Sequence, residues 1–289
     1  MDREYKKLKK ELGQKLVELS KEAESEENLY QAKELIKQGA EVNFNRCRPM
    51  FFACKGYNFS LIRYFIGVGA LAEPLSRNYL SGMCQRGAFD EEKEQKFFEL
   101  IDLAILKTGF SKEYILHYFK TMLLEGNVEK AKTIGDKYGV SLRQMLEDVP
   151  LHIIIECLEL KREESLELIN LYQNRMQEAF DASIAGGRDK AIEYIYARGF
   201  DLIPDRDSIL KAIMNGYMST IHLLNIKGVD MRGDWCLVTA ARVFSLRPEP
   251  LKFLLDKYVK DISEAGMQAL KALSEQENNE ALKEFLLTR

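Results

Sequence analysis

The chain has 289 residues, a mass of 33.4 kDa and a formal net charge of −3, from 42 basic and 45 acidic side chains. A hydrophobic fraction of 46% excludes a disordered chain, and the near-balanced charge argues against a general nucleic-acid binder, which needs a basic excess. No run reaches the ~18 apolar residues that a membrane span requires, and the charged start lacks the apolar core of a secretory signal. Five scattered cysteines are typical of a protein in a reducing compartment. We therefore expect a cytoplasmic protein.

Residues 1–27 are predicted to form an N-terminal capping helix. Leucines recur there every three or four positions and so lie on one helical face, at Leu8, Leu12, Leu16 and Leu19. This face is expected to cover the first repeat of the array that follows, because the ends of such an array must be capped. A coiled-coil dimer is the alternative interpretation, although the stripe is shorter than coiled coils usually require.

Glycines punctuate the helical segments that follow. Apolar helical runs end in Gly plus a small or apolar residue at positions 39, 69, 109, 139, 199 and 228, which are 30, 40, 30, 60 and 29 residues apart. Asn174 stands inside the longest interval, where one more unit fits. Gly and Asn are the residues that most readily close a helix with a left-handed backbone. A period of about 30 to 33 residues predicts a solenoid of helix pairs and not two globular domains.

The segment from residue 45 to residue 70 carries the clearest repeat pattern. It reads R-P-M-F-F-A-C over residues 48–54, S-L-I-R-Y-F-I over residues 60–66 and G-A over residues 69–70. It resembles the ankyrin repeat, whose pattern is T-P-L-H-x-A-A, a short turn, V-x-x-L-L and then G-A. V-P-L-H at residues 149–152 is nearly the full family tetrapeptide, and other segments keep fragments of the pattern.

The resemblance implies an all-α fold, an α-solenoid of stacked helix pairs. It implies about eight degenerate repeats over residues 28–265, closed by C-terminal capping helices over residues 266–289 in one continuous solenoid. Pro49 would begin an inner helix, Ala53 and Cys54 would form a small core pair, and His152 would hydrogen-bond the neighbouring repeat's backbone. Residues 90–96 are interpreted as an insertion in one longer repeat. Tetratricopeptide or other helical solenoids are the alternative architectures.

Two glycine motifs suggest nucleotide binding, and neither has the required context. G-V-G-A-L-A at residues 67–72 fits the G-x-G-x-x-A fingerprint, but a helix is predicted to end where that fingerprint needs one to begin. Gly186 and Gly187 lack the G-K-[ST] ending of a phosphate loop and fall at the turn between two helices. We therefore expect no cofactor.

Histidines and cysteines give no signature of a metal site or a nucleophile. No histidine has a second ligand three or four residues away, at His117, His152 or His222. Cys54 and Cys157 lie at apolar helical positions, whereas Cys47 and Cys236 lie near predicted loop tips and are expected to be exposed. No local pattern marks a thiol as catalytic, so an enzyme would need a geometry that the sequence does not display.

The positive signal is a set of large side chains at positions that the core does not fix. In the ankyrin family, the loop tips before each inner helix and the exposed face of that helix form the ligand surface. Trp, Tyr and Arg are enriched at interface hot spots because they bury much area and keep a polar group. Packing of Phe44 or Trp235 on an adjacent loop is the alternative. Partner binding is predicted for Phe44, Arg46, Phe52, Lys55, Tyr57, Arg77, Tyr79, Tyr217, Arg232 and Trp235.

These predictions together indicate a non-enzymatic protein–protein interaction module that presents a concave surface of loop tips and inner helices to another protein. We expect a monomer that binds neither nucleic acid nor a membrane. An effector or inhibitor delivered into a host cell stays open, because the acidic segment 274–280 resembles glutamate-rich secretion signals. Two rival interpretations are an RNA-binding helical repeat, which would need a basic inner face, and a cryptic enzyme, which would need a deep pocket.

Overall fold

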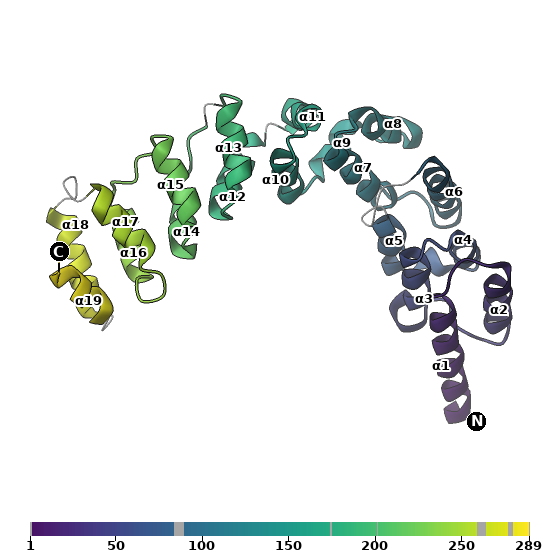
Figure 1. Cartoon of the computed structure of the whole chain (residues 1–289). Helices are drawn as coiled ribbons and strands as arrows, with labels where there is room; N and C mark the ends of the chain where they lie inside the picture. The colour runs from purple at the N-terminus through teal and green to yellow at the C-terminus, as the bar shows by residue number, and fades with distance from the viewer. Residues whose placement is uncertain are drawn as a thin grey trace. The chain divides into compact units, whose positions relative to one another are not determined.

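The computed structural model describes residues 2–83, 90–173, 175–200, 202–258, 264–276 and 280–288. These residues form helices α1 to α19 and one short 3-10 turn, η1, and no strand occurs among them. The prediction of an all-α chain of helical repeats is confirmed at this level. The chain forms two compact units, residues 1–148 and residues 149–289, each with its own set of helices (Figure 1).

Helix pairs in the first unit stack in two rows. In the first row, α1 packs on α3, α3 on α5 and α5 on α7, whereas in the second row α2 packs on α4 and α4 on α6. Contacts between α1 and α2 make α1 the first-row member of the first pair. The elements are α1 (Asp2–Leu19), α2 (Glu26–Lys37), α3 (Phe44–Lys55), α4 (Phe59–Gly67), η1 (Ala70–Ala72), α5 (Pro74–Ser81), α6 (Glu91–Thr108), α7 (Glu113–Glu125), α8 (Val128–Tyr138) and α9 (Leu142–Glu147).

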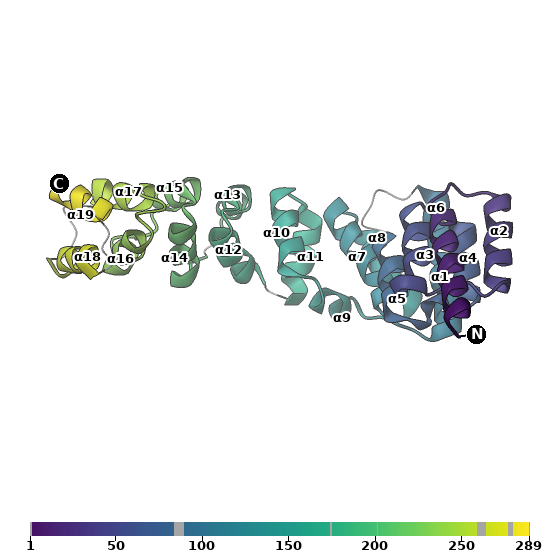
Figure 2. The same ribbon diagram turned by 90° about the horizontal axis from the view of Figure 1, so that it is seen from below.

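The second unit repeats the same two-row arrangement. Its first row is α10, α12, α14, α16 and α18, each packed on the next, and its second row includes α13, α15 and α17. Figure 2 shows α13, α15 and α17 as a layer above α12, α14 and α16. The elements are α10 (Leu151–Glu159), α11 (Glu163–Gln173), α12 (Met176–Ala185), α13 (Asp189–Ala197), α14 (Arg206–Asn215), α15 (Met218–Ile226), α16 (Asp234–Arg242), α17 (Glu249–Tyr258), α18 (Glu264–Gln276) and α19 (Glu280–Leu287).

The glycines that the sequence predicts as helix terminators follow α2, α4, α6, α8, α13 and α15. Each has a positive φ, between 66° and 104°, which is a backbone conformation that residues other than glycine rarely adopt. This confirms the glycine periodicity as the chain's repeat signal, and the residues are Gly39, Gly69, Gly109, Gly139, Gly199 and Gly228. The proposed substitute, Asn174, lies outside the described residues.

The contacts between repeats are apolar on both rows. Ala53 and Cys54 of α3 are buried, as the small core pair was predicted to be, and Ile62, Phe65 and Ile66 of α4 are buried with them. Full burial of one such large side chain contributes about 1.5–3 kcal/mol. Because each pair has an apolar face toward its neighbour, the stack is held together mainly by contacts between adjacent pairs.

Three local expectations change in the structure. Residues 90–96 lengthen a helix: the Asp90 carboxylate accepts from the Lys93 N–H (2.8 Å) and so caps α6. The expectation that Cys47 and Cys236 are exposed is wrong, since they are 1% and 0% exposed. Cys47 lies in a turn folded onto the core, and Cys236 faces the core from the first turn of α16. The predicted hydrogen bond of His152 is also wrong, since its side chain is exposed on α10 and has no partner among the described residues.

Candidate partner-binding surface

The chain makes a left-handed turn immediately before the regular part of α3. Asn45, Arg46 and Cys47 have φ values of 48°, 59° and 59°. This conformation costs a non-glycine residue about 1–2 kcal/mol, so three in succession need support from surrounding contacts. The sequence does not predict this turn, because only Asn45 of the three residues is a type that readily adopts a left-handed conformation, and glycine is absent.

Neighbouring side chains hold this turn in place. The Phe44 ring lies so close to α1 that a Cβ on Gly13 would come within 2.5 Å of it. The Tyr79 hydroxyl of α5 donates to the Arg46 carbonyl oxygen (3.0 Å), and Cys47 Sγ donates to the Asn43 side-chain oxygen (3.5 Å). Two neighbouring first-row helices, α1 and α5, therefore fix the backbone from which the exposed Arg46 side chain extends.

Half-buried aromatic rings and cations meet beside the turn. The centroid of the Phe51 ring lies 5.1 Å from that of Phe52 and 5.2 Å from that of Tyr79, both edge to face. Lys21 Nζ lies 5.0 Å from the centre of the Phe52 ring, and the guanidinium carbon of Arg48 lies 5.6 Å from it. Both distances fall within the range of a cation–π interaction. Phe52 is thus flanked by two cations from different parts of the chain.

A groove with a volume of about 310 Å³ opens between α1 and the start of α3. Glu18 is the one acid along it, and this carboxylate is paired with Lys21 Nζ at 2.7 Å. Lys10 and Arg48 therefore give the groove an excess of positive charge. We call it the basic groove, and its lining residues are Lys10, Gln14, Val17, Glu18, Lys21, Phe44, Asn45 and Arg48.

Cations without an anionic partner continue along α3. Between residues 42 and 89 the sequence holds six bases, at positions 46, 48, 55, 63, 77 and 86, and one acid, Glu73. The side chains of Arg46, Arg48 and Lys55 are exposed, and none of them forms an ion pair with any residue in the described part of the chain. Because no acid among the described residues pairs with them, these three side chains are available to an anionic ligand.

The structure brings together some of the predicted residues of the first unit and separates others. Phe52, Tyr79 and the Arg46 backbone belong to one cluster on α3 and α5. Tyr57 instead bridges two repeats, since its hydroxyl donates to the Met83 carbonyl oxygen (2.9 Å). Arg77 is half-buried, and its Nε–H is buried with no hydrogen-bond partner among the described residues.

Two residues of the cluster were not predicted from the sequence, Arg48 and Lys21. The available signal was the acid-free run of residues 42–72, which holds four bases at positions 46, 48, 55 and 63. Lys21 could not be found in this way, because it lies 27 positions before Arg48 and reaches Phe52 only when α1 packs on α3.

The predicted residues of the second unit form separate contacts. Tyr217 packs on the preceding repeat, where a Cβ on Gly187 would come within 2.8 Å of its ring. Trp235 lies under the Arg206 guanidinium at 5.1 Å and directly over Gly233. The exposed Arg232 forms a bidentate pair with Asp230 (2.9 and 3.0 Å), which neutralises it.

The Arg232 guanidinium also lowers the pKa of Asp230 to about 2. A tip whose charges are paired internally attracts an ionic partner less than the α3 surface does. The first unit is therefore the better candidate for an ionic partner surface.

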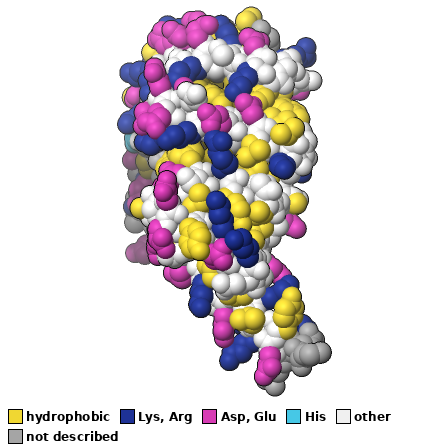
Figure 3. All heavy atoms as spheres, turned by 90° about the vertical axis from the view of Figure 1, so that its right-hand side faces the viewer, with side chains coloured by type: hydrophobic (Ala, Val, Ile, Leu, Met, Phe, Trp, Pro, Cys, Tyr) yellow, Lys and Arg dark blue, Asp and Glu magenta, His cyan; other side chains and the backbone are white. Residues whose placement is uncertain are grey.

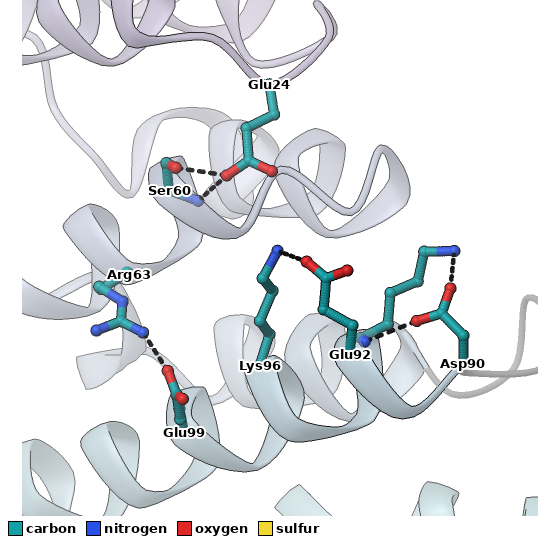
Figure 4. Close-up of polar contacts among 8 residues, drawn as sticks. Glu24, Ser60, Arg63, Asp90, Glu92, Lys96 and Glu99 are labelled. Atoms are coloured by element: carbon teal, nitrogen blue, oxygen red, sulfur yellow. Dashed lines mark hydrogen bonds and ion pairs between the residues drawn. The ribbon is translucent and has the colours of Figure 1, made fainter.

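A second groove of about 660 Å³ lies on the second row of the first unit, between α2, α4 and α6. Polar contacts within the chain occupy most of its charged side chains (Figure 4). Glu24 accepts from the Ser60 N–H (2.7 Å) and hydroxyl, Arg63 pairs with Glu99 (2.5 Å), and Lys96 with Glu92 (2.6 Å). The Glu24–Ser60 and Arg63–Glu99 contacts tie neighbouring helix pairs together, whereas Lys96–Glu92 lies within α6, so these contacts have a structural role.

The exposed side of the first helix pair carries a groove of about 680 Å³ between α1 and α2. Leu19, Tyr30 and Leu35 line it together with several charged side chains. Figure 3, which views the molecule from this side, shows hydrophobic side chains interspersed with charges of both signs. Two of its acids are paired within the chain, Glu18 with Lys21 and Glu34 with Lys37.

The pKa values of two buried cysteines and one half-buried histidine are shifted from their ordinary values. Burial raises the pKa of the Cys157 and Cys236 thiols to about 12, which leaves almost no thiolate at neutral pH. Burial and the nearby Lys120 lower the pKa of His117. In the described part of the chain, no group of three or more His, Cys, Asp or Glu side chains converges as metal ligands would, and no helix is long and apolar enough to cross a membrane.

Comparison of the chain with protein-family models, with curated proteins and with solved structures finds no match. The function proposed below is therefore based on the contacts and charges of the described residues.

Proposed function

We propose that the chain is a non-enzymatic protein-interaction module made of degenerate ankyrin-like repeats, which binds a protein partner through the first-row face of its first unit. One observation carries the proposal. Phe52 lies between Lys21 and Arg48 beside the basic groove, with Arg46 and Lys55 exposed and without an anionic partner among the described residues. An aromatic ring beside arginine side chains is a composition typical of interface hot spots.

Local features support the ankyrin-like assignment of the repeats. Pro49 stands at the start of the regular part of α3, where a missing N–H costs nothing, and the small pair Ala53 and Cys54 is buried. Glycine with positive φ follows α2, α4, α6, α8, α13 and α15, as the G-A ending of that family would require. A preformed stack of this kind contributes its contacts without a large ordering cost on binding.

The test is capture of binding proteins from a lysate by two double variants with equal changes in net charge. Arg48→Glu with Lys55→Glu reverses charges on α3, and Lys107→Glu with Lys190→Glu reverses exposed charges on α6 and α13. Circular dichroism first establishes that the helical content of both equals that of the wild type. We expect the first variant to lose a discrete protein that the control variant and the wild type retain. Equal capture by both variants would exclude the α3 face as the interface.

RNA binding is the second candidate function, and one observation favours it. The run of residues 42–89, with six bases and one acid, could neutralise phosphates locally although the whole chain is acidic. Nuclease treatment of the lysate before capture separates the two: a protein partner survives the treatment, whereas a ribonucleoprotein bridge does not.

A further inference from the structure

We propose that the ligand of the basic groove is an acidic peptide segment of the partner, with carboxylates that alternate with an apolar side chain seated on Phe52. This inference rests on the proposed function and specifies the chemistry of the partner. It is based on the side chains around the groove, the rings beside it and the support of the left-handed turn.

Several cations at and near the basic groove form no ion pair with the described residues. Lys10 and Arg48 line the basic groove, and Arg46 and Lys55 lie before and after Arg48 on the same helix, all exposed and without an ion pair to any described residue. Lys21 is already occupied by Glu18 (2.7 and 2.8 Å). Four cations in excess would repel one another and a basic ligand, whereas carboxylates on a bound segment would neutralise them.

The aromatic rings beside the basic groove indicate that the ligand is not acidic throughout. Phe52 is half-buried, Phe51 packs on it edge to face, and Tyr79 in turn packs edge to face on Phe51. The exposed part of the ring offers an apolar contact between the cations of Lys21 and Arg48. A peptide residue placed there would bury apolar area while its acidic neighbours reach the exposed Arg48 and Lys55, which is how an anchor and a charged rim share an interface.

The left-handed turn supplies preorganisation. Residues in a disfavoured backbone conformation persist where the surroundings fix them, and such sites occur preferentially at ligand-binding positions. Here Phe44 against Gly13 and the Tyr79 hydroxyl on the Arg46 carbonyl oxygen fix the turn. The backbone from which the Arg46 side chain extends is therefore fixed before any ligand arrives, which reduces the entropy lost on binding.

The experiment is selection of a random peptide library on the intact immobilised chain, followed by affinity measurement of the selected peptides by fluorescence anisotropy. We expect enrichment of Asp and Glu around one apolar residue. Affinity for these peptides should fall about tenfold or more in the Arg48→Glu, Lys55→Glu variant, stay within about twofold of wild type in the Lys107→Glu, Lys190→Glu control, and weaken as salt is added.

Three results would overturn the inference. Selected peptides without acidic enrichment, or acidic peptides that bind both variants equally, would exclude the carboxylate ligand while leaving a protein-interaction function intact. Failure of the proposed function is recognised separately by the lysate capture described above. A single-stranded RNA oligonucleotide that binds more tightly than every selected peptide, and loses affinity in the same variant, would assign the groove to nucleic acid instead.

Discussion

Gly13 lies inside α1, where alanine would ordinarily stabilise the helix. Replacing an exposed helical glycine by alanine gains about 1 kcal/mol, because glycine loses more backbone entropy on folding. In this chain a Cβ on Gly13 would come within 2.5 Å of Phe44 Cγ and Cδ2. These atoms belong to the base of the ring, so the ring can relieve the overlap only by leaving α1.

The Gly13→Ala variant is therefore expected to be less stable than the wild type. Overpacking costs about 1–3 kcal/mol and outweighs the propensity gain, which leaves a net loss of about 1 kcal/mol in the free energy of unfolding. In a Phe44→Ala background the overlap disappears, and Gly13→Ala should stabilise by about 1 kcal/mol. The coupling energy between the two positions is then about 2 kcal/mol, which a double-mutant cycle measures directly.

Urea unfolding followed by circular dichroism gives the four free energies. Gly67→Ala provides the matched control, because Gly67 ends helix α4 and a Cβ there would meet nothing within 4 Å. That substitution should stabilise or leave stability unchanged in both backgrounds. Equal stabilisation by Gly13→Ala with and without Phe44 would contradict the predicted overlap, since the ring would then not occupy the space above Gly13.

Three further predictions concern the packing and titration of single residues. Gly187→Ala should lower the free energy of unfolding in urea more than Gly39→Ala does. Both residues have positive φ, but of the two only Gly187 lies under a neighbouring ring, that of Tyr217. Equal losses of stability would contradict this packing. His117, whose pKa is lowered by burial and by Lys120, should make the folded chain less stable as pH falls below about 6.5, since the unfolded chain then binds the proton more readily. His117→Gln should reduce that pH slope, and an unchanged slope would assign it to other groups. Alkylation near pH 8 followed by peptide mass spectrometry should leave Cys157 unmodified in the native chain and modify it after denaturation, because burial raises its pKa to about 12; rapid native modification would show an open site.

Much of the architecture could be predicted because it depends on local residue chemistry. A glycine after each apolar helical run closes that helix wherever it occurs, so its spacing reports the repeat directly, as at Gly69 and Gly139. Burial of Ala53 follows in the same way from its place in the repeat pattern.

The details of the candidate surface depend on contacts that no local pattern contains. Burial of Cys47 follows from a left-handed turn of non-glycine residues, which propensity disfavours and which Tyr79 and Phe44 hold from two other helices. Cys236 shows the same limit, since only the packing of α16 decides which way its first turn faces. Arg48 and Lys21 meet over one ring only after α1 packs on α3, so no spacing in the sequence links them.

Site-specific photo-cross-linking tests whether a protein partner binds at α3. Lys55 and Lys107 are both exposed and both lie in the last turn of a helix, α3 in the first row and α6 in the second. A photoreactive amino acid is placed at each position in turn, and the intact chain is irradiated in a nuclease-treated lysate. A partner surface on α3 predicts a covalent adduct with a discrete protein from position 55 and none from position 107. Adducts from position 107 alone, or from neither position, would contradict a partner surface on α3.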